Sequence, residues 1–548
     1  MNRTIQIITA FAMVLPFGCS NLKKQQMDLI IHNAIIYTVD DAFSTAEAAA
    51  IKDGMFVAVG SNEEILSHYT SKNRIDLNGK FVYPGLIDPH AHFFGYGTSL
   101  ANPDLFGTRS FEEIIALISA HHEKYGGEWI YGRGWDQNEW PVKEFPQRSQ
   151  LDAVFPDIPV LLIRVDGHAA IANSEALRRA GVTASATVPG GEVIVAGGEP
   201  TGILIDNAIG LVRRLIPPLT REQEINALVN AQENCFSVGL TSVNDAGLPK
   251  RTIELIDSMQ QAGSLKMRIY AMLNPNEENF QAYMFNGIYK TDHLHIRSVK
   301  LFADGALGSR GAKMIEPYSD EPGNAGLLVE TPEFLAEISR KAFEHGYQVA
   351  THCIGDSANR LMLQIYSSIL GGPNDHRWRI EHAQVVHPED FDLFGQYNII
   401  PSIQTIHATS DMLWAIDRVG PERIRGAYAY QQLLEQNGWL PNGSDFPVEP
   451  INPLYGFYAA IERKNFDEHP PSGFQMENAL TREQALRAMT IWAAKAQFEE
   501  HEKGSIEPGK FADFIVLQQD LMTMPAGGIN TLPVEMTFVG GEKVYPHF

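Results

Sequence analysis

The chain has 548 residues, more than a single domain usually holds, which favours either one large barrel with satellite domains or two to three domains. Its formal net charge of -23 argues against a nucleic-acid partner, because binding phosphate groups requires a positively charged face. Its three cysteines, Cys19, Cys235 and Cys353, are too few for a disulfide scaffold, and we expect no disulfide.

Residues 1–19 have the features of an export signal. Arg3 precedes an apolar stretch at 5–17, which is too short for a permanent membrane-spanning helix. Gly18-Cys19-Ser20 then resembles the cleavage point of a bacterial lipoprotein, where the cysteine thiol carries the lipid. We expect lipidation at Cys19, a tether at 20–27, and an exported protein that is periplasmic or membrane-anchored through this lipid alone. An ordinary export signal and a short buried helix are the alternatives.

Both ends of the remaining chain are rich in β-branched residues. Residues 28–84 contain short apolar segments and an Asp53-Gly54 pair, a dipeptide typical of hairpin turns. Residues 505–548 have the same texture. We therefore expect the two ends to build one small β-sandwich domain together.

The middle of the chain, 85–504, alternates short apolar strands with helical stretches, as repeated βα units do. The pattern predicts an α/β fold, a (β/α)8 TIM barrel. The stretch at about 93–225 is too long for a βα loop, so it predicts an inserted subdomain after barrel strand 1. Eight strands are expected, at 82–87, 240–244, 267–273, 298–303, 347–352, 378–382, 399–404 and 440–445.

Residue types that bind metals occur at the ends of these strands. His90 and His92 follow the first strand two positions apart, so in an extended chain both imidazoles face the same side. Barrel enzymes carry their chemistry at the carboxyl ends of the strands, where these side chains would converge. Four further residues of this kind lie on the fourth strand and at the ends of the fifth, sixth and eighth strands: Lys300, His352, His382 and Asp445.

This set of side chains predicts a site for divalent metal ions. Imidazole and carboxylate groups suit zinc and similar ions. A lysine ammonium cannot bind a metal, but a buried lysine with a lowered pKa can form a carbamate whose two oxygens bridge two ions. Taken singly, each residue has a structural explanation: the histidines in the core, Asp445 as a helix cap, and Lys300 paired with Asp304. Their order at successive strand ends favours the metal site.

The sequence resembles the amidohydrolase superfamily, and within it the amidohydrolase family 3 branch, which includes N-substituted formamide deformylases. The resemblance covers almost all of the chain after the leader. The matching stretches are VYPGLIDPHAHF (82–93), RVDGHAAIANS (164–174), VKLFADGALGSRGA (299–312), THCIGDSA (351–358), RIEHAQ (379–384), QTIHATSDM (404–412), GSDFPVEPINPL (443–454) and GSIEPGKFADFIVL (504–517).

The resemblance implies two divalent metal ions, with zinc the expected element, and hydrolysis of a C–N bond. The bond would be an amide, N-acyl or N-formyl bond of a small molecule, attacked by metal-activated hydroxide. The resemblance implies that His90 and His92 bind the more buried ion and that His352 and His382 bind the second. Lys300 would bridge the two ions as a carbamate, and Asp445 would act both as a ligand and as the base.

Other residues are expected to form the substrate pocket. His168 would stabilise the oxyanion from the inserted segment, with a structural loop histidine as the alternative. Trp135 and Asp136 would line the pocket from above, unless they are a packing tryptophan and a loop carboxylate. Weaker candidates follow the seventh strand: Gln404, His407 and Asp411.

Three alternative functions remain. A deaminase on the same barrel is disfavoured by Lys300, because deaminases of the superfamily generally use one metal and lack the bridging lysine. An ester or lactone hydrolase would need the same metals. A non-catalytic sensor or binding protein would have lost ligands, and none is lost here. The expected partner is the small-molecule substrate, and a homodimer is left open.

Overall fold

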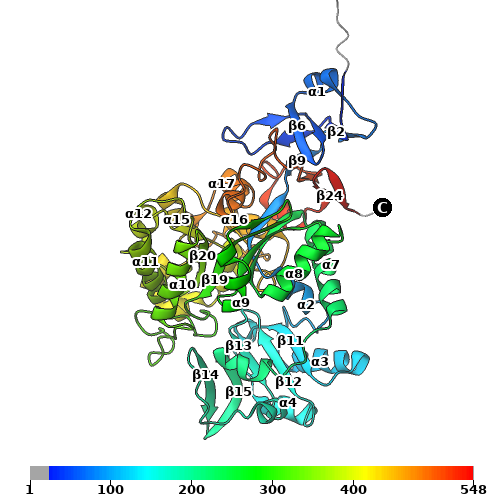
Figure 1. Ribbon diagram of the computed structural model, residues 1–548. Coiled ribbons are helices and arrows are strands. Elements are labelled where there is room, and N and C mark those ends of the chain that lie inside the picture. Colours follow the sequence, from blue (N-terminus) through cyan, green and yellow to red (C-terminus); the bar gives the residue numbers. More distant parts are fainter. Residues whose placement is uncertain (1–23, 547–548) are drawn as a thin grey trace, which may run out of the picture.

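The structure, a computed structural model, describes residues 24–546 (Figure 1). Cys19, the expected signal and the first residues of the expected tether lie outside this range. Within it, no helix combines the length and apolar character needed to cross a membrane.

A nearly closed parallel barrel forms the centre of the molecule. Hydrogen bonding joins its strands in the order β10 (Leu86–Ala91), β16 (Leu240–Leu248), β17 (Arg268–Leu273), β19 (Leu294–Phe302), β20 (Gln348–Cys353), β21 (Arg379–His382) and β22 (Ile400–Ser402). Every residue of β10, β17, β20 and β21 is buried, as expected where helices cover the outside of a parallel sheet and side chains fill the inside.

Helices between the strands cover the outside of the barrel (Figure 1). Local sequence fixes where they begin: a capping box of Thr220 and Gln223 starts the first of them, and Thr331 caps another that has Pro332 at its first position. These helices include α7 (Arg221–Ser237), α8 (Lys250–Gln261), α10 (Pro332–Glu344), α11 (Asp356–Leu370), α12 (Phe391–Gln396) and α15 (Tyr430–Asn437).

The first barrel strand differs from the expected one. The stretch at 82–87 is divided at Gly85 between β9 (Phe81–Pro84), which belongs to a terminal sheet, and β10. A Cβ atom on Gly85 would lie 2.3 Å from Thr241 Oγ1, so only glycine allows this close approach. The barrel strand therefore runs further than expected, to Ala91, and it carries His90 itself.

The predicted eighth strand at 440–445 is wrong. Only Asn442 forms a bridge, to Ile403, although the segment still fills the gap between β22 and β10. Asp445 has a left-handed φ of 63°, which a regular strand cannot contain. Single backbone hydrogen bonds still join the segment to both neighbours, from Gly443 N to Ile403 O at 2.9 Å and from Asp445 N to His90 O at 2.8 Å. Asp88 adds a side-chain bond, since it accepts from the Ser444 hydroxyl at 2.6 Å.

The segment between β10 and β16 contains α2 (Phe93–Ser99), α3 (Phe111–Tyr125) and a separate five-stranded sheet (Figure 1, cyan). Trp135 and Leu162 lie in the hydrophobic core of this sheet. The strand ends that face the barrel carry Arg164 and the turn with His168. In pairing order, the strands are β11 (Ile130–Trp135), β12 (Val160–Arg164), β13 (Ala169–Ala172), β15 (Glu199–Asp206) and β14 (Gly191–Ala196).

Strands from the two ends of the chain share a six-stranded sheet. Its strands are, in pairing order, β25 (Glu542–Tyr545), β24, β23 (Phe514–Leu517), β9, β3 (Ile35–Tyr37) and β4 (Thr45–Ala46). β23 is antiparallel to β9, and β9 is parallel to β3. Phe514 stacks on Phe538 of β24 (Val534–Val539) with ring centroids 4.2 Å apart. A four-stranded sheet of residues 29–76 packs beside it, in the order β6 (Met55–Gly60), β5 (Ala48–Lys52), β2 (Leu29–His32) and β8 (Arg74–Asp76).

Candidate metal centre

Two histidines and an aspartate form a cluster that could hold a metal ion. The ligand atoms of His90, His92 and Asp445 all lie within 4.8 Å of one another. Asp445 Oδ1 is 3.5 Å from His90 Nε2 and 3.3 Å from His92 Nε2. This oxygen is buried and has no hydrogen-bond partner among the described residues. A buried carboxylate oxygen needs a partner, and a cation between these three groups would supply it.

The other expected ligands surround this cluster. The His382 ring lies 4.9 Å from the His90 ring and 4.6 Å from the His352 ring, centroid to centroid. Lys300 Nζ is 3.1 Å from His90 Nε2. The structure thus brings together all six side chains that the sequence places at strand ends, although the second pair of histidines is not part of the compact cluster.

Lys300 is buried in surroundings that favour its neutral form. Its side chain is 1% exposed, and burial lowers its pKa to about 8. Within residues 24–546 no ion pair joins it to Asp304, whose carboxylate instead accepts backbone N–H groups of Ile354 and Gly355 at 3.0 and 2.8 Å. A lysine that loses its proton readily can react with carbon dioxide, so these residues fit a carbamate.

Side chains behind the histidines fix their orientation. Glu381 Oε2 lies 2.5 Å from His90 Nδ1, and Arg379 donates to the other oxygen of the same carboxylate at 2.5 Å. The Gln404 amide oxygen lies 2.6 Å from His382 Nδ1. In both rings the occupied Nδ1 leaves Nε2 to face the centre, as is usual for metal-binding histidines. Burial lowers the pKa of His90 to about 4, so the imidazole is neutral and able to bind a cation.

Sequence reasoning missed Glu381 and Arg379. The available signal was their spacing: residues two apart on a buried strand face the same side, and an arginine and a glutamate there require partners. Burial alone would raise the pKa of Glu381, but Arg379 and His90 outweigh it and hold that pKa far below its usual value. The carboxylate therefore stays ionised behind His90.

His168 reaches the same centre from the inserted sheet. Its ring centroid lies 4.8 Å from that of His352, and its Nδ1 lies 2.6 Å from Asp206 Oδ1. Burial opposes protonation of His168, but the hydrogen bond and charge of Asp206 outweigh it and raise the pKa of the imidazole. Asp206 was not anticipated from the sequence. Because Asp206 bonds Nδ1 of His168, the Nε2–H group of the ring points away from Asp206.

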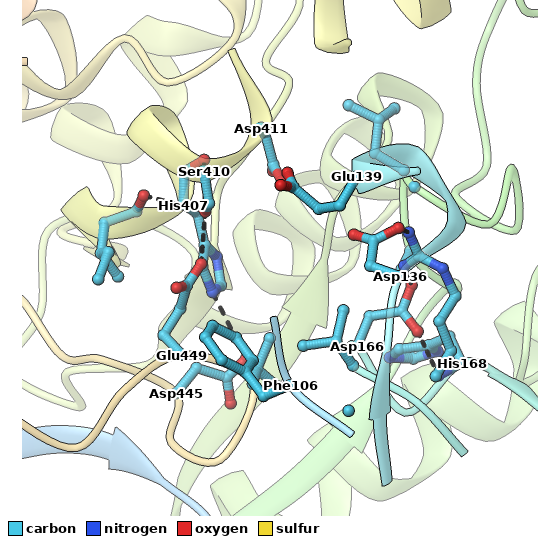
Figure 2. Close-up of a pocket in the computed structure, with 18 of the residues that line it drawn as sticks. Phe106, Asp136, Glu139, Asp166, His168, His407, Ser410, Asp411, Asp445 and Glu449 are labelled. Carbon is cyan, nitrogen blue, oxygen red and sulfur yellow. Dashed lines mark hydrogen bonds and ion pairs between the residues drawn. The ribbon is translucent and has the colours of Figure 1, made fainter. Parts of the chain in front are cut away.

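A cavity of about 300 Å³ opens above these side chains. His92, Lys300, His352, His382 and Asp445 line its floor, and His168, Asp136, His407 and Asp411 contribute to its walls. Figure 2 shows His407 and Glu449 on one side, with Asp136, Asp166 and His168 on the other.

Two of the expected pocket residues lie elsewhere. Trp135 is fully buried and packs in the hydrophobic core of the inserted sheet. Its indole N–H donates to Leu162 O at 2.9 Å, so the ring is bonded within that core and does not face the cavity. Gln404 is 1% exposed and its amide oxygen is held by His382, so it orients that histidine and does not face the cavity.

A nearly closed parallel barrel with a histidine–aspartate cluster at the carboxyl ends of its strands is the architecture of metal-dependent hydrolases. Residues 73–545 match the family model described as the amidohydrolase family, and the chain belongs to that family. It is therefore a metal-dependent hydrolase of the amidohydrolase type.

Individual relatives extend over nearly the whole chain. It is 35% identical to the protein LONG AFTER FAR-RED 3 of Arabidopsis thaliana, covering 95% of this chain and 92% of that protein. It is 26% identical to an N-substituted formamide deformylase of Arthrobacter pascens, covering 95% and 99%. A solved structure, an uncharacterized metal-dependent hydrolase from Pyrococcus horikoshii OT3, matches with a TM-score of 0.74 and 29% identity, covering 91% of this chain and 99% of that one.

Proposed function

We propose that the protein hydrolyses the C–N bond of a small-molecule amide, N-acyl or N-formyl compound, using two divalent cations. One observation carries this proposal: three histidines, a lysine and an aspartate line the floor of a single cavity, and the buried His90 clusters with His92 and Asp445 beneath it. The nitrogen and carboxylate donors suit zinc. The similarity to a deformylase supports cleavage of an amide-type bond.

The donors divide between two cations. His90 and His92 would hold one cation and His352 and His382 the other. Lys300, as a carbamate, would offer one oxygen to each. When bound, the cations would act as Lewis acids and make a water molecule nucleophilic near neutral pH.

Two residues of the chain would handle the proton and the developing charge. Asp445 would accept the proton of the attacking water and pass it to the leaving nitrogen, because it lies at the cavity floor between His90 and His92. His168, held at Nδ1 by Asp206, would donate from Nε2 to the oxyanion that forms at the scissile carbonyl.

A hydrolysis screen tests this proposal. The full chain, prepared with zinc and bicarbonate, is offered N-acyl, N-formyl and cyclic amides alongside esters, lactones and amino-heterocycles. We expect an amine and a carboxylate from at least one amide class, and a rate lower by about 10²-fold or more for Asp445→Asn prepared in the same way. Cleavage of esters or lactones alone would contradict the proposal. So would ammonia release from the heterocycles alone.

A further inference from the structure

Two carboxyl groups on the cavity wall, the buried Glu449 and the partly buried Asp411, have no cationic partner among the described residues. Glu449, which is 8% exposed, accepts a hydrogen bond from the Ser410 hydroxyl at 2.5 Å. Asp411 accepts from the Tyr428 hydroxyl at 2.7 Å and from the Gln384 amide at 3.2 Å. Within residues 24–546, no lysine or arginine lies within ion-pair distance of Glu449, nor does any pair with Asp411.

Three other carboxylates that line the cavity differ, because arginines pair with them. Arg164 is bonded to both Asp136 and Asp166. Arg109 pairs with Glu139 at 3.0 Å. These arginines therefore have their own counter-ions, whereas a negative charge on Glu449 or Asp411 would not be compensated within the wall.

The energetics of this wall favour a positively charged ligand. Burial, together with the nearby Asp411, raises the pKa of Glu449 to about 8, and burial raises the pKa of Asp411 to about 7. Ionising both carboxyls in the empty cavity is therefore unfavourable, and a cation beside them would reverse this.

His407, on the same wall, has a ring nitrogen without a hydrogen bond within the described chain, 4.0 Å from Asp445 Oδ2. His407 is 8% exposed and lines the cavity next to Ser410 and Glu449 (Figure 2). Its Nε2 is buried without a hydrogen bond to any described residue. Buried polar atoms of this kind are usually paired, so the wall has unused bonding capacity for a polar ligand.

We propose that the outer cavity binds a cationic group of the substrate, an ammonium or a guanidinium, through Glu449 and Asp411. The scissile amide of the same molecule would lie at the metal-binding floor. This inference rests on the proposed function for the position of the amide, whereas the binding of the cation depends only on the cavity wall. It assigns the substrate class: amides that carry a basic nitrogen away from the bond that is cleaved.

Isosteric ligands test the cation site without requiring turnover. Binding of butylguanidinium and butylurea to the zinc-loaded full chain is measured by calorimetry, since the two differ in charge and hardly in shape. We expect the wild type to prefer the cation by about tenfold or more, because charge-assisted hydrogen bonds are the stronger class. Equal affinity for the two, or tighter binding of the urea, would overturn the inference.

The variant Glu449→Gln distinguishes two ways in which Glu449 could bind a ligand, as a carboxylate or as a neutral acid. If Glu449 acts as a carboxylate, Glu449→Gln should bring the affinity ratio to within about twofold of unity, losing most of the charge-assisted bond. If Glu449 instead acts as a neutral acid towards a carbonyl, glutamine replaces it and the ratio does not change, which contradicts the inference. Asp411→Asn should lower the preference for butylguanidinium over butylurea at least partly. If Glu449→Gln does not fold, an unchanged preference in Asp411→Asn would contradict the inference.

Glu224→Gln is the matched control. Glu224 is also 8% exposed, but it lies on α7 and pairs with Arg251 at 2.9 Å, outside the cavity. Its replacement should leave the affinity ratio as in the wild type. A ratio that falls equally in Glu224→Gln would show that a general effect of charge is being measured, and would overturn the assignment to Glu449.

Hydrolysis of paired substrates then links the cation site to the reaction. N-formyl alkylamines ending in a methyl or in an ammonium group are compared by kcat/KM, and we expect the ammonium compound to be preferred. Hydrolysis of both at equal rates would contradict the inference and leave the proposed function intact. Binding of the cation without hydrolysis of any amide would contradict the proposed function instead.

Discussion

Replacing Glu381 by glutamine tests how the fold prepares His90 for a metal. Glu381 bonds His90 Nδ1 with one oxygen and Arg379 with the other, both at 2.5 Å. A glutamine has a single acceptor oxygen, so it can serve either the histidine or the arginine, and its NH₂ then faces a donor. Loss of such an orienting carboxylate weakens metal affinity by about 10–100-fold. Breaking a buried ion pair also costs about 3–5 kcal/mol of folding stability.

The assay is a titration with zinc in competition with a chelator, on protein that thermal unfolding shows to be folded. Glu499→Gln is the matched control. Glu499 is a buried glutamate that pairs with Lys503 at 2.7 Å outside the metal-binding cavity, so its loss should lower stability without changing zinc affinity. Wild-type zinc affinity in Glu381→Gln, or an equal loss of affinity in Glu499→Gln, would refute the reasoning.

The remaining predictions concern the proton, the oxyanion and the anchor. Asp445→Asn should retain part of its metal while the rate falls by about 10²–10⁴-fold, the usual worth of a general base; metal content and kcat on one preparation decide this. Asp206→Asn should lower kcat with metal content unchanged, because asparagine tolerates the left-handed φ of 48° but no longer holds His168 as a carboxylate does. A normal kcat would contradict that role. Cys19→Ser should abolish membrane partitioning and the lipid mass on the N-terminal peptide, and an unchanged partition would exclude the anchor.

Much of the barrel and the convergence of the candidate ligands could be predicted, because apolar periodicity locates strands and the carboxyl ends of parallel strands meet at one face. His90, His352 and His382 lie at such ends. The predicted strand at 440–445 failed because the left-handed φ of Asp445 interrupts it, while Asp88, distant in sequence, accepts hydrogen bonds from Ser444. A pattern of apolar residues cannot reveal either feature.

The surroundings of the candidate ligands were harder to predict than the candidate ligands. Glu381 and Asp206 bond histidines that are distant from them in sequence, so no local spacing shows which histidine each of them orients. Trp135 was misplaced because an aromatic next to a pocket residue can belong to a neighbouring core. Glu449 could not be identified as a candidate site residue from the sequence, because its burial without a cationic partner is visible only in the structure.

Metal stoichiometry of the wild type and of Lys300→Ala is the most direct test of the two-cation centre. Both proteins are purified with zinc and bicarbonate, and ions per chain are measured together with the rate on an amide found by the screen. We predict two ions per chain for the wild type. Lys300→Ala should hold one ion or fewer and show no turnover, with partial recovery when a short carboxylic acid replaces the carbamate. Two ions and a near-normal rate in Lys300→Ala would contradict the account, since Lys300 would then be only a buried core residue.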